Sequence, residues 1–71
     1  MDEREKRLLV ALVKMVRQYL DHHKDGLVDT CCMSAGEHAV SVLAEYGLMD
    51  ALPDGRFGRW TEAGDDFWES N

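Results

Sequence analysis

Residues 45–64 of the chain read EYGLMDALPDGRFGRWTEAG, and this stretch predicts how the second half of the chain folds. Two short apolar runs, 48–52 and 57–60, flank the sequence PDGR, which is typical of a turn between paired strands. We therefore expect a β-hairpin here. Thr61 is a suitable N-cap for a closing helix over 62–69, with Phe67 and Trp68 facing inward.

A second helix is expected over 34–46, immediately before this stretch. Ser34 and Glu37 have the spacing of a capping box, and apolar residues then recur at helical intervals up to Tyr46. Gly47 suits the left-handed C-terminal cap. The preceding segment, 27–33, is ambiguous between a brief strand at 27–28 and a short helix capped by Asp29.

The first part of the chain, 2–23, is expected to form one long helix that Asp25 and Gly26 terminate. Ten of the thirteen residues in 8–20 are apolar, so the helix is apolar nearly all round. A chain of 71 residues has little mass with which to cover such a helix. We therefore expect a homodimer formed through this helix.

The order of these elements resembles the winged-helix superfamily over about residues 34–69. The sequences EYGLM at 45–49 and GRFGRWTEAG at 55–64 carry the resemblance. It implies one α+β domain over 1–71, a small winged-helix-like fold whose hairpin is the wing. It also implies that helix 34–46 enters the major groove of DNA and that Arg56 reaches the neighbouring DNA backbone or the minor groove. The chain departs from the family at 27–33, where the second helix is shortened or missing.

The charge distribution opposes DNA binding. The net charge is −6, which excludes non-specific nucleic-acid binding through a uniformly basic surface. Helix 34–46 contains no Lys, Arg, Asn or Gln, the residue types that usually contact bases. Its outward positions are Glu37, His38, Ser41 and Glu45.

Two function classes follow. The first is a non-enzymatic, acidic protein-interaction module that docks on a basic partner protein. It could be a phage or mobile-element inhibitor that mimics nucleic acid, as anti-CRISPR proteins do. The residues expected to bind the partner are Glu37, Glu45, Asp50, Asp54, Glu62, Asp65, Asp66 and Glu69. The alternative is a compact winged-helix transcriptional regulator that binds DNA through Arg7, Lys14, Arg17, Arg56 and Arg59.

Metal binding and catalysis are not expected. Five candidate zinc ligands lie within a short stretch, namely His22, His23, Cys31, Cys32 and His38. However, the chain has no Cys-x-x-Cys pair, and adjacent cysteines rarely both reach one metal, so a zinc-stapled domain is only a third possibility. A cysteine nucleophile paired with His38 would lack a substrate pocket of ordinary size in so small a chain. We therefore expect no cofactor, no metal and no enzymatic activity.

The aromatic side chains are expected to lie mostly in the core, with Trp60 or Trp68 partly exposed.

The charged start of the chain is unlike a signal peptide, and the apolar run 8–20 is too short and too interrupted to span a membrane. We expect no membrane association and a cytoplasmic location, with the cysteines kept as thiols.

Overall fold

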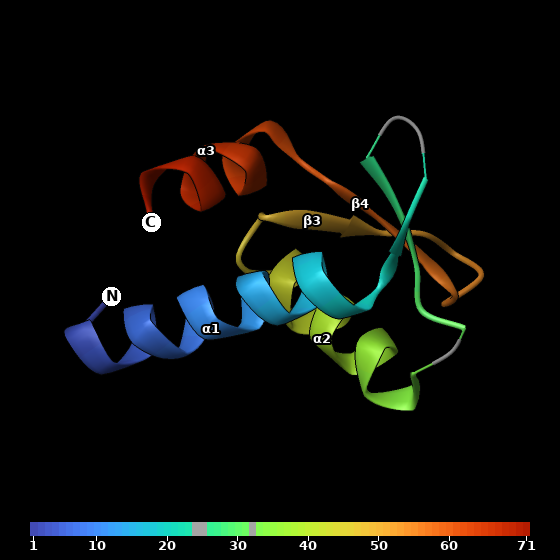
Figure 1. The fold of residues 1–71 in the computed structure, drawn as a ribbon, viewed down its shortest axis with the longest axis horizontal. Coiled ribbons are helices and arrows are strands. Elements are labelled where there is room, and N and C mark those ends of the chain that lie inside the picture. The colour runs from blue at the N-terminus through green and yellow to red at the C-terminus, as the bar shows by residue number, and fades with distance from the viewer. Residues whose placement is uncertain (24–25, 32) are drawn as a thin grey trace.

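The computed structural model describes residues 1–23, 26–31 and 33–71 and confirms a small α+β fold (Figure 1). Over these residues, three helices accompany one antiparallel sheet of four short strands in the order β1-β2-β4-β3. The elements in chain order are α1 (Glu3–Tyr19), β1 (Asp21–His22), β2 (Leu27–Asp29), α2 (Ser34–Glu45), β3 (Met49–Ala51), β4 (Phe57–Trp60) and α3 (Glu62–Ser70).

The predicted hairpin is confirmed. β3 pairs antiparallel with β4, with Met49 opposite Trp60 and Asp50 opposite Arg59. The Asp54 carboxylate shapes the turn because it accepts hydrogen bonds from the backbone N–H of Arg56 (3.0 Å) and of Phe57 (3.2 Å). The hairpin is therefore fixed by its own local sequence, and β2 then pairs with the other edge of β4.

The N-terminal helix ends earlier than predicted. α1 stops at Tyr19, and the chain becomes extended at Leu20 and pairs with β2 through Asp21 and His22. Leu20 is buried, and the His23 N–H donates to the Leu27 carbonyl at 2.7 Å. Sheet pairing and burial thus override helix propensity here. Gly26, with φ of 73°, follows β1 instead of capping a helix; the predicted stop residue Asp25 lies outside the described residues.

The start of α2 also differs from the prediction. Ser34 is the first helical residue, and the N-cap is Met33, whose side chain makes no capping hydrogen bond. The chain reaches α2 through Thr30, whose hydroxyl donates to the Arg56 carbonyl at 2.6 Å and thereby fixes the entry. The ambiguous segment is strand β2 followed by a turn, with no α-helix in its described part. At the other end, Gly47 has the predicted left-handed conformation, with φ of 76°.

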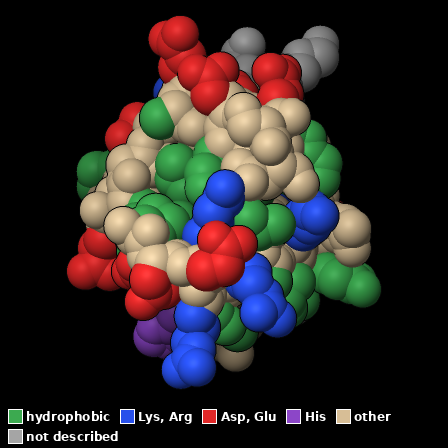
Figure 2. All heavy atoms as spheres, turned by 90° about the vertical axis from the view of Figure 1, so that its left-hand side faces the viewer, with side chains coloured by type: hydrophobic (Ala, Val, Ile, Leu, Met, Phe, Trp, Pro, Cys, Tyr) green, Lys and Arg blue, Asp and Glu red, His purple; other side chains and the backbone are tan. Residues whose placement is uncertain are grey.

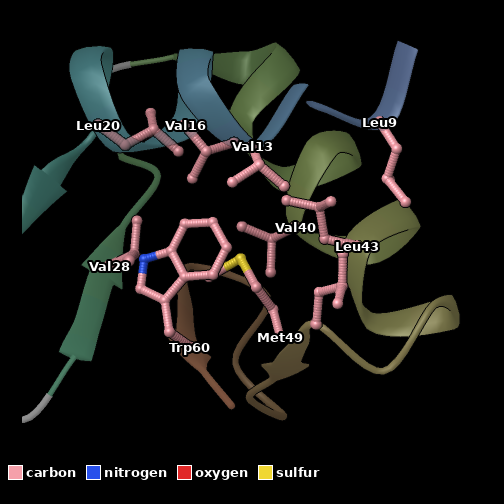
Figure 3. Packing of buried hydrophobic residues seen from close by; sticks show 10 residues of the cluster. Leu9, Val13, Val16, Leu20, Val28, Val40, Leu43, Met49 and Trp60 are labelled. Carbon is pink, nitrogen blue, oxygen red and sulfur yellow. The ribbon is translucent and has the colours of Figure 1, made fainter. Parts of the chain in front are cut away.

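The core lies between the sheet and the two long helices, which run antiparallel on the same side of it (Figures 1 and 3). α1 contributes Leu9, Val13 and Val16, and the sheet contributes Val28, Met49 and Trp60. Phe67 and Trp68 of α3 pack against this cluster and are half-buried, as expected. The expectation that the aromatic residues are core is wrong for Tyr19 and Tyr46, which are exposed on α1 and after α2.

The Thr61 cap of α3 is confirmed. Its hydroxyl accepts from the Gly64 N–H at 3.0 Å and donates to the Gly47 carbonyl at 2.7 Å. One side chain therefore both starts α3 and ties it to the end of α2.

Candidate interaction surfaces

Three carboxylates form an exposed acidic stripe on α3. Glu62, Asp66 and Glu69 recur at i, i+4 and i+7, so they share one side of the helix, and all three are exposed. No ion pair among the described residues involves them. In Figure 2 acidic side chains lie at the level of α3, above a group of Lys and Arg side chains. We call Glu62, Asp66 and Glu69 the acidic stripe.

The other predicted partner-binding acids are dispersed over the fold. Glu37 approaches the hairpin so closely that a Cβ on Gly55 would lie 3.1 Å from its Oε1 atom, and Asp54 shapes the same turn. Asp50 lies opposite Arg59 in the sheet, and Glu45 is exposed at the end of α2. The eight acids therefore form no single surface.

Asp65 is held by Arg17, and the two residues clamp α1 to α3. The Arg17 Nη2 atom lies 2.7 Å from Asp65 Oδ1. The guanidinium also lies over two rings, 4.3 Å from the centroid of Trp60 and 5.2 Å from that of Trp68. Arg17 is therefore a packing residue and is a poor candidate for contact with DNA. No pattern in the sequence predicts this pair, whose members are 48 residues apart.

Arg56, the wing arginine of the winged-helix resemblance, is bound within the protein. Its Nε and Nη2 atoms donate to the two oxygens of Asp29, each at 2.9 Å. The Cys31 N–H also donates to this carboxylate at 2.9 Å, and His23 Nε2 lies 3.9 Å from it. The Arg56 hydrogen bonds, followed by that from Cys31, hold the pKa of Asp29 far below its usual value. In turn, Asp29 raises the pKa of Arg56.

The ion pair between Arg56 and Asp29 should change how the stability of the protein depends on pH in acid. A carboxylate whose pKa is lowered by folding stabilises the protein above its unfolded-state pKa, near 4, and loses this contribution as the pH falls through the folded-state value. In Arg56→Gln the folded-state pKa of Asp29 rises toward its unfolded-state value, so the variant should melt at a lower temperature than the wild type near neutral pH, lose less stability as the pH falls, and approach the wild type in acid. Melting curves between pH 2 and pH 7, the range in which an ordinary aspartate of the unfolded chain loses its charge, measure this convergence. Arg59→Gln, which removes the same charge from an exposed neighbour, should keep the acid dependence of the wild type; equal changes in both variants would contradict the assignment.

The remaining predicted DNA contacts do not form a ridge. Arg7 and Lys14 lie on the exposed side of α1, beside a shallow hollow that Asn71 also lines. Arg59 projects from the opposite side of the sheet, because its neighbours Gly58 and Trp60 are the buried positions of β4. Arg17 and Arg56 are bound by Asp65 and Asp29, and the five cations do not gather on one surface.

The candidate zinc ligands are not assembled in the described part of the chain. There, no group of three or more His, Cys, Asp or Glu side chains is placed to share a metal ion. His22 uses both ring nitrogens, because Nδ1 donates to the Leu20 carbonyl at 2.9 Å and Nε2 accepts from the Trp60 indole at 3.1 Å. His38 is exposed on α2, and Cys32 lies outside the described residues.

Two further findings concern membrane-spanning helices and the comparison with known proteins. Over the described residues, no helix combines the length and the apolar character that crossing a bilayer requires. No family model, no curated protein and no solved structure matches the sequence or the fold.

Proposed function

We propose that this chain is a non-enzymatic protein-interaction module whose acidic stripe docks on a basic surface of a partner protein. The supporting observation is that Glu62, Asp66 and Glu69 are exposed on one side of α3, with no ion pair among the described residues. Like charges at this spacing destabilise an isolated helix by about 0.2–0.5 kcal/mol per pair. A basic partner would remove this repulsion on binding.

The helix that carries the stripe is firmly attached, which favours binding without rearrangement. Thr61 caps α3 and ties it to Gly47, and the pair Arg17–Asp65 joins the other side of the helix to α1. A pre-organised surface loses little conformational entropy when it binds. The acidic stripe therefore meets a partner in a fixed geometry.

The row of like charges in the stripe is the basis of the nucleic-acid-mimic form of the proposal, although its charges are less dense than those of DNA. With about 1.5 Å of rise per residue, its three carboxylates are spaced by about 6 Å and 4.5 Å along the axis. One strand of duplex DNA carries a phosphate for about every 3.4 Å of axis. A groove that binds nucleic acid is thus a suitable partner, as expected for a phage or mobile-element inhibitor. We place the module in the cytoplasm.

The transcriptional-regulator alternative has less support. Two of its five cations, Arg17 and Arg56, already bind Asp65 and Asp29. The outward side of α2 carries Glu37 and Glu45 and no cation. Carboxylates at this position repel phosphates instead of contacting them.

We further propose that the module works as a homodimer joined through α1. The support is that Leu8, Met15 and Tyr19 of this helix are all more than half exposed. Large apolar side chains on one exposed helix face are typical of an interface.

A matched pair of charge variants tests the docking proposal. Glu62→Gln/Glu69→Gln removes two of the three charges of the stripe, and Glu3→Gln/Asp21→Asn removes the same charge from exposed positions that are not expected to bind the partner. A partner captured from the native cells with the tagged chain is purified and titrated with each variant. The stripe variant should bind at least about tenfold more weakly, a loss of about 1.4 kcal/mol, and the control about as well as the wild type.

Competition and mobility-shift measurements complete the test. Duplex DNA added to the complex should displace the chain from a nucleic-acid groove. Equal losses in both variants would overturn the role of the stripe. Retention of a DNA duplex by the chain itself at physiological salt would overturn the proposal in favour of a gene regulator.

A further inference from the structure

The exposed apolar surface of the described chain is concentrated on one face. Apart from Met1, every large hydrophobic side chain that is exposed lies on α1 or α2 or at the ends of α2. These residues are Leu8, Met15, Tyr19, Met33, Val42 and Tyr46. We call this surface the α1–α2 face.

Each helix contributes a stripe with the same spacing. On α1 the stripe is Leu8, Leu12, Met15 and Tyr19, and on α2 and its C-cap it is Ala35, Ala39, Val42 and Tyr46. Both follow the intervals four, three and four, which is the pattern of helices that pack along their length. The fully buried residues of each helix lie about 100° away from its stripe. Leu12 and Ala39 are partly buried against the core, and the other stripe residues are exposed and can contact a partner.

The antiparallel arrangement places matching parts of the two stripes at the same level. Met15 and Tyr19 line a hollow together with Ala35 and Ala39, whereas Leu8 and Leu12 lie beside Val42 and Tyr46. The Tyr46 hydroxyl donates to Glu5 and closes this second end. At the first end, α1 therefore presents large side chains where α2 presents small ones.

This combination of a ridge and a hollow is self-complementary. The hollow over Ala35, Gly36 and Ala39 has a volume of about 90 Å³ and an almost entirely apolar lining. The adjacent α1 ridge carries Met15 at 55% exposure and Tyr19 at 67%. A two-fold axis along the helices would bring the ridge of one copy over the hollow of the other, as a closed symmetric interface requires.

We propose that a second copy of this chain covers the α1–α2 face, with α1 of each copy lying antiparallel over α2 of the other. The inference deepens the proposed α1 homodimer and rests on it. Met15 and Tyr19 of one copy occupy the hollow above Ala35 and Ala39 of the other. The four helices then form a bundle in which every neighbouring pair is antiparallel, a stable arrangement for helices joined in this way.

The charged edges of the face fit this arrangement. Arg4 lies on the outer edge of α1, one turn before Leu8, and Glu45 lies on the outer edge of α2 beside Tyr46; both are exposed. Because α1 begins at the level where α2 ends, Arg4 of one copy comes beside Glu45 of the other. The rest of the rim is mostly small or uncharged, with Ala11, Gln18, His38 and Ser41.

The size of the face is sufficient for a stable dimer. Its six large exposed side chains present on the order of 600 Å², close to the 800 Å² that each partner buries in a standard interface. The largest exposed apolar patch of an ordinary monomer is about 300–600 Å². The face thus lies at the upper end of the range for monomers, and with its polar rim it approaches the area of a dimer interface.

Sedimentation equilibrium over a concentration series tests the proposal with three designed changes. Met15→Glu should abolish dimerisation through any α1 interface. Ala39→Trp fills the hollow and should weaken the dimer at least about thirtyfold, whereas Ala63→Trp on exposed α3 should not. Because Trp at position 39 could disturb folding, melting curves of the monomeric protein accompany these measurements.

A charge exchange gives a test that leaves the fold unchanged. Arg4→Glu and Glu45→Arg each place like charges across the dimer and should weaken it, and a mixture of the two variants should form heterodimers of near wild-type affinity. If Met15→Glu dimerises as strongly as the wild type, or if the wild type is itself monomeric, the α1 dimer is overturned altogether. If Met15→Glu breaks the dimer, Ala39→Trp preserves it, and the mixture of Arg4→Glu and Glu45→Arg forms no tighter dimer than either variant alone, only the α1-over-α2 arrangement is overturned.

Discussion

Gly64→Ala is expected to destabilise the protein by more than about 3 kcal/mol, because α3 meets the backbone of residue 48 at this point. A Cβ at Gly64 would lie 2.0 Å from the Leu48 carbonyl oxygen and 3.0 Å from Cε3 of Trp60. The Leu48 carbonyl cannot retreat freely, since it accepts the Thr61 N–H at 3.1 Å. A domain of this size is stable by only about 4–10 kcal/mol, so the loss is a large fraction of the total. Urea and thermal unfolding measure it.

Ala63→Gly is the matched control for this prediction. It changes the neighbouring residue of the same helix at an exposed position, so it should cost only about 1 kcal/mol. The two variants exchange the same methyl group in opposite directions. A Gly64→Ala protein that melts within a few degrees of the wild type would contradict the close packing of α3 on the segment before β3.

The parts of the fold that the sequence predicted are those that depend on neighbouring residues. The hairpin follows from the turn sequence at 53–56, and Asp54 makes its hydrogen bonds within three residues. The α3 cap follows from Thr61, which binds the N–H of Gly64. In both cases the deciding interaction is local, so it leaves a signal in a short stretch of sequence.

The predictions that were wrong concern interactions over long separations. α1 ends early where Asp21 and His22 pair with β2, which is close in the sequence, and where His22 binds Trp60, a residue 38 positions away. A helix pattern up to residue 23 contains no information about that partner. The capping box at Ser34 was displaced in the same way, since Thr30 is fixed by a carbonyl on the hairpin.

The candidate surfaces show the same division. The acidic stripe could be predicted from its spacing along α3, because exposed positions of one helix are neighbours in sequence. The neutralisation of Asp65 by Arg17 and of Arg56 by Asp29 could not, because each pair joins distant segments. The charge of the chain is thus visible in its sequence, whereas the charge left at the surface depends on the fold.

Val13→Asp is expected to leave the chain unfolded, and it separates the core side of α1 from its exposed side. Val13 is only 1% exposed and lies within the cluster that joins α1 to α2 and the sheet (Figure 3). A carboxylate at this position would be buried without a partner, or protonated at a cost of several kcal/mol. That cost is comparable with the total stability expected for a domain of this size. Far-ultraviolet circular dichroism should show loss of helix at 25 °C, the reference temperature of these stability values.

Ala11→Asp provides the comparison on the same helix. Ala11 is exposed, and Arg7 and Lys14 lie four residues before it and three after it, where they favour a carboxylate. This variant should therefore keep the wild-type spectrum and melt within a few degrees of the wild type. If Val13→Asp stays folded as well, α1 does not bury this side against the sheet, and its apolar residues must be covered by something other than the core. An unfolded Val13→Asp beside a folded Ala11→Asp means that one side of α1 already completes the core, so that the exposed Leu8, Met15 and Tyr19 are available to a partner.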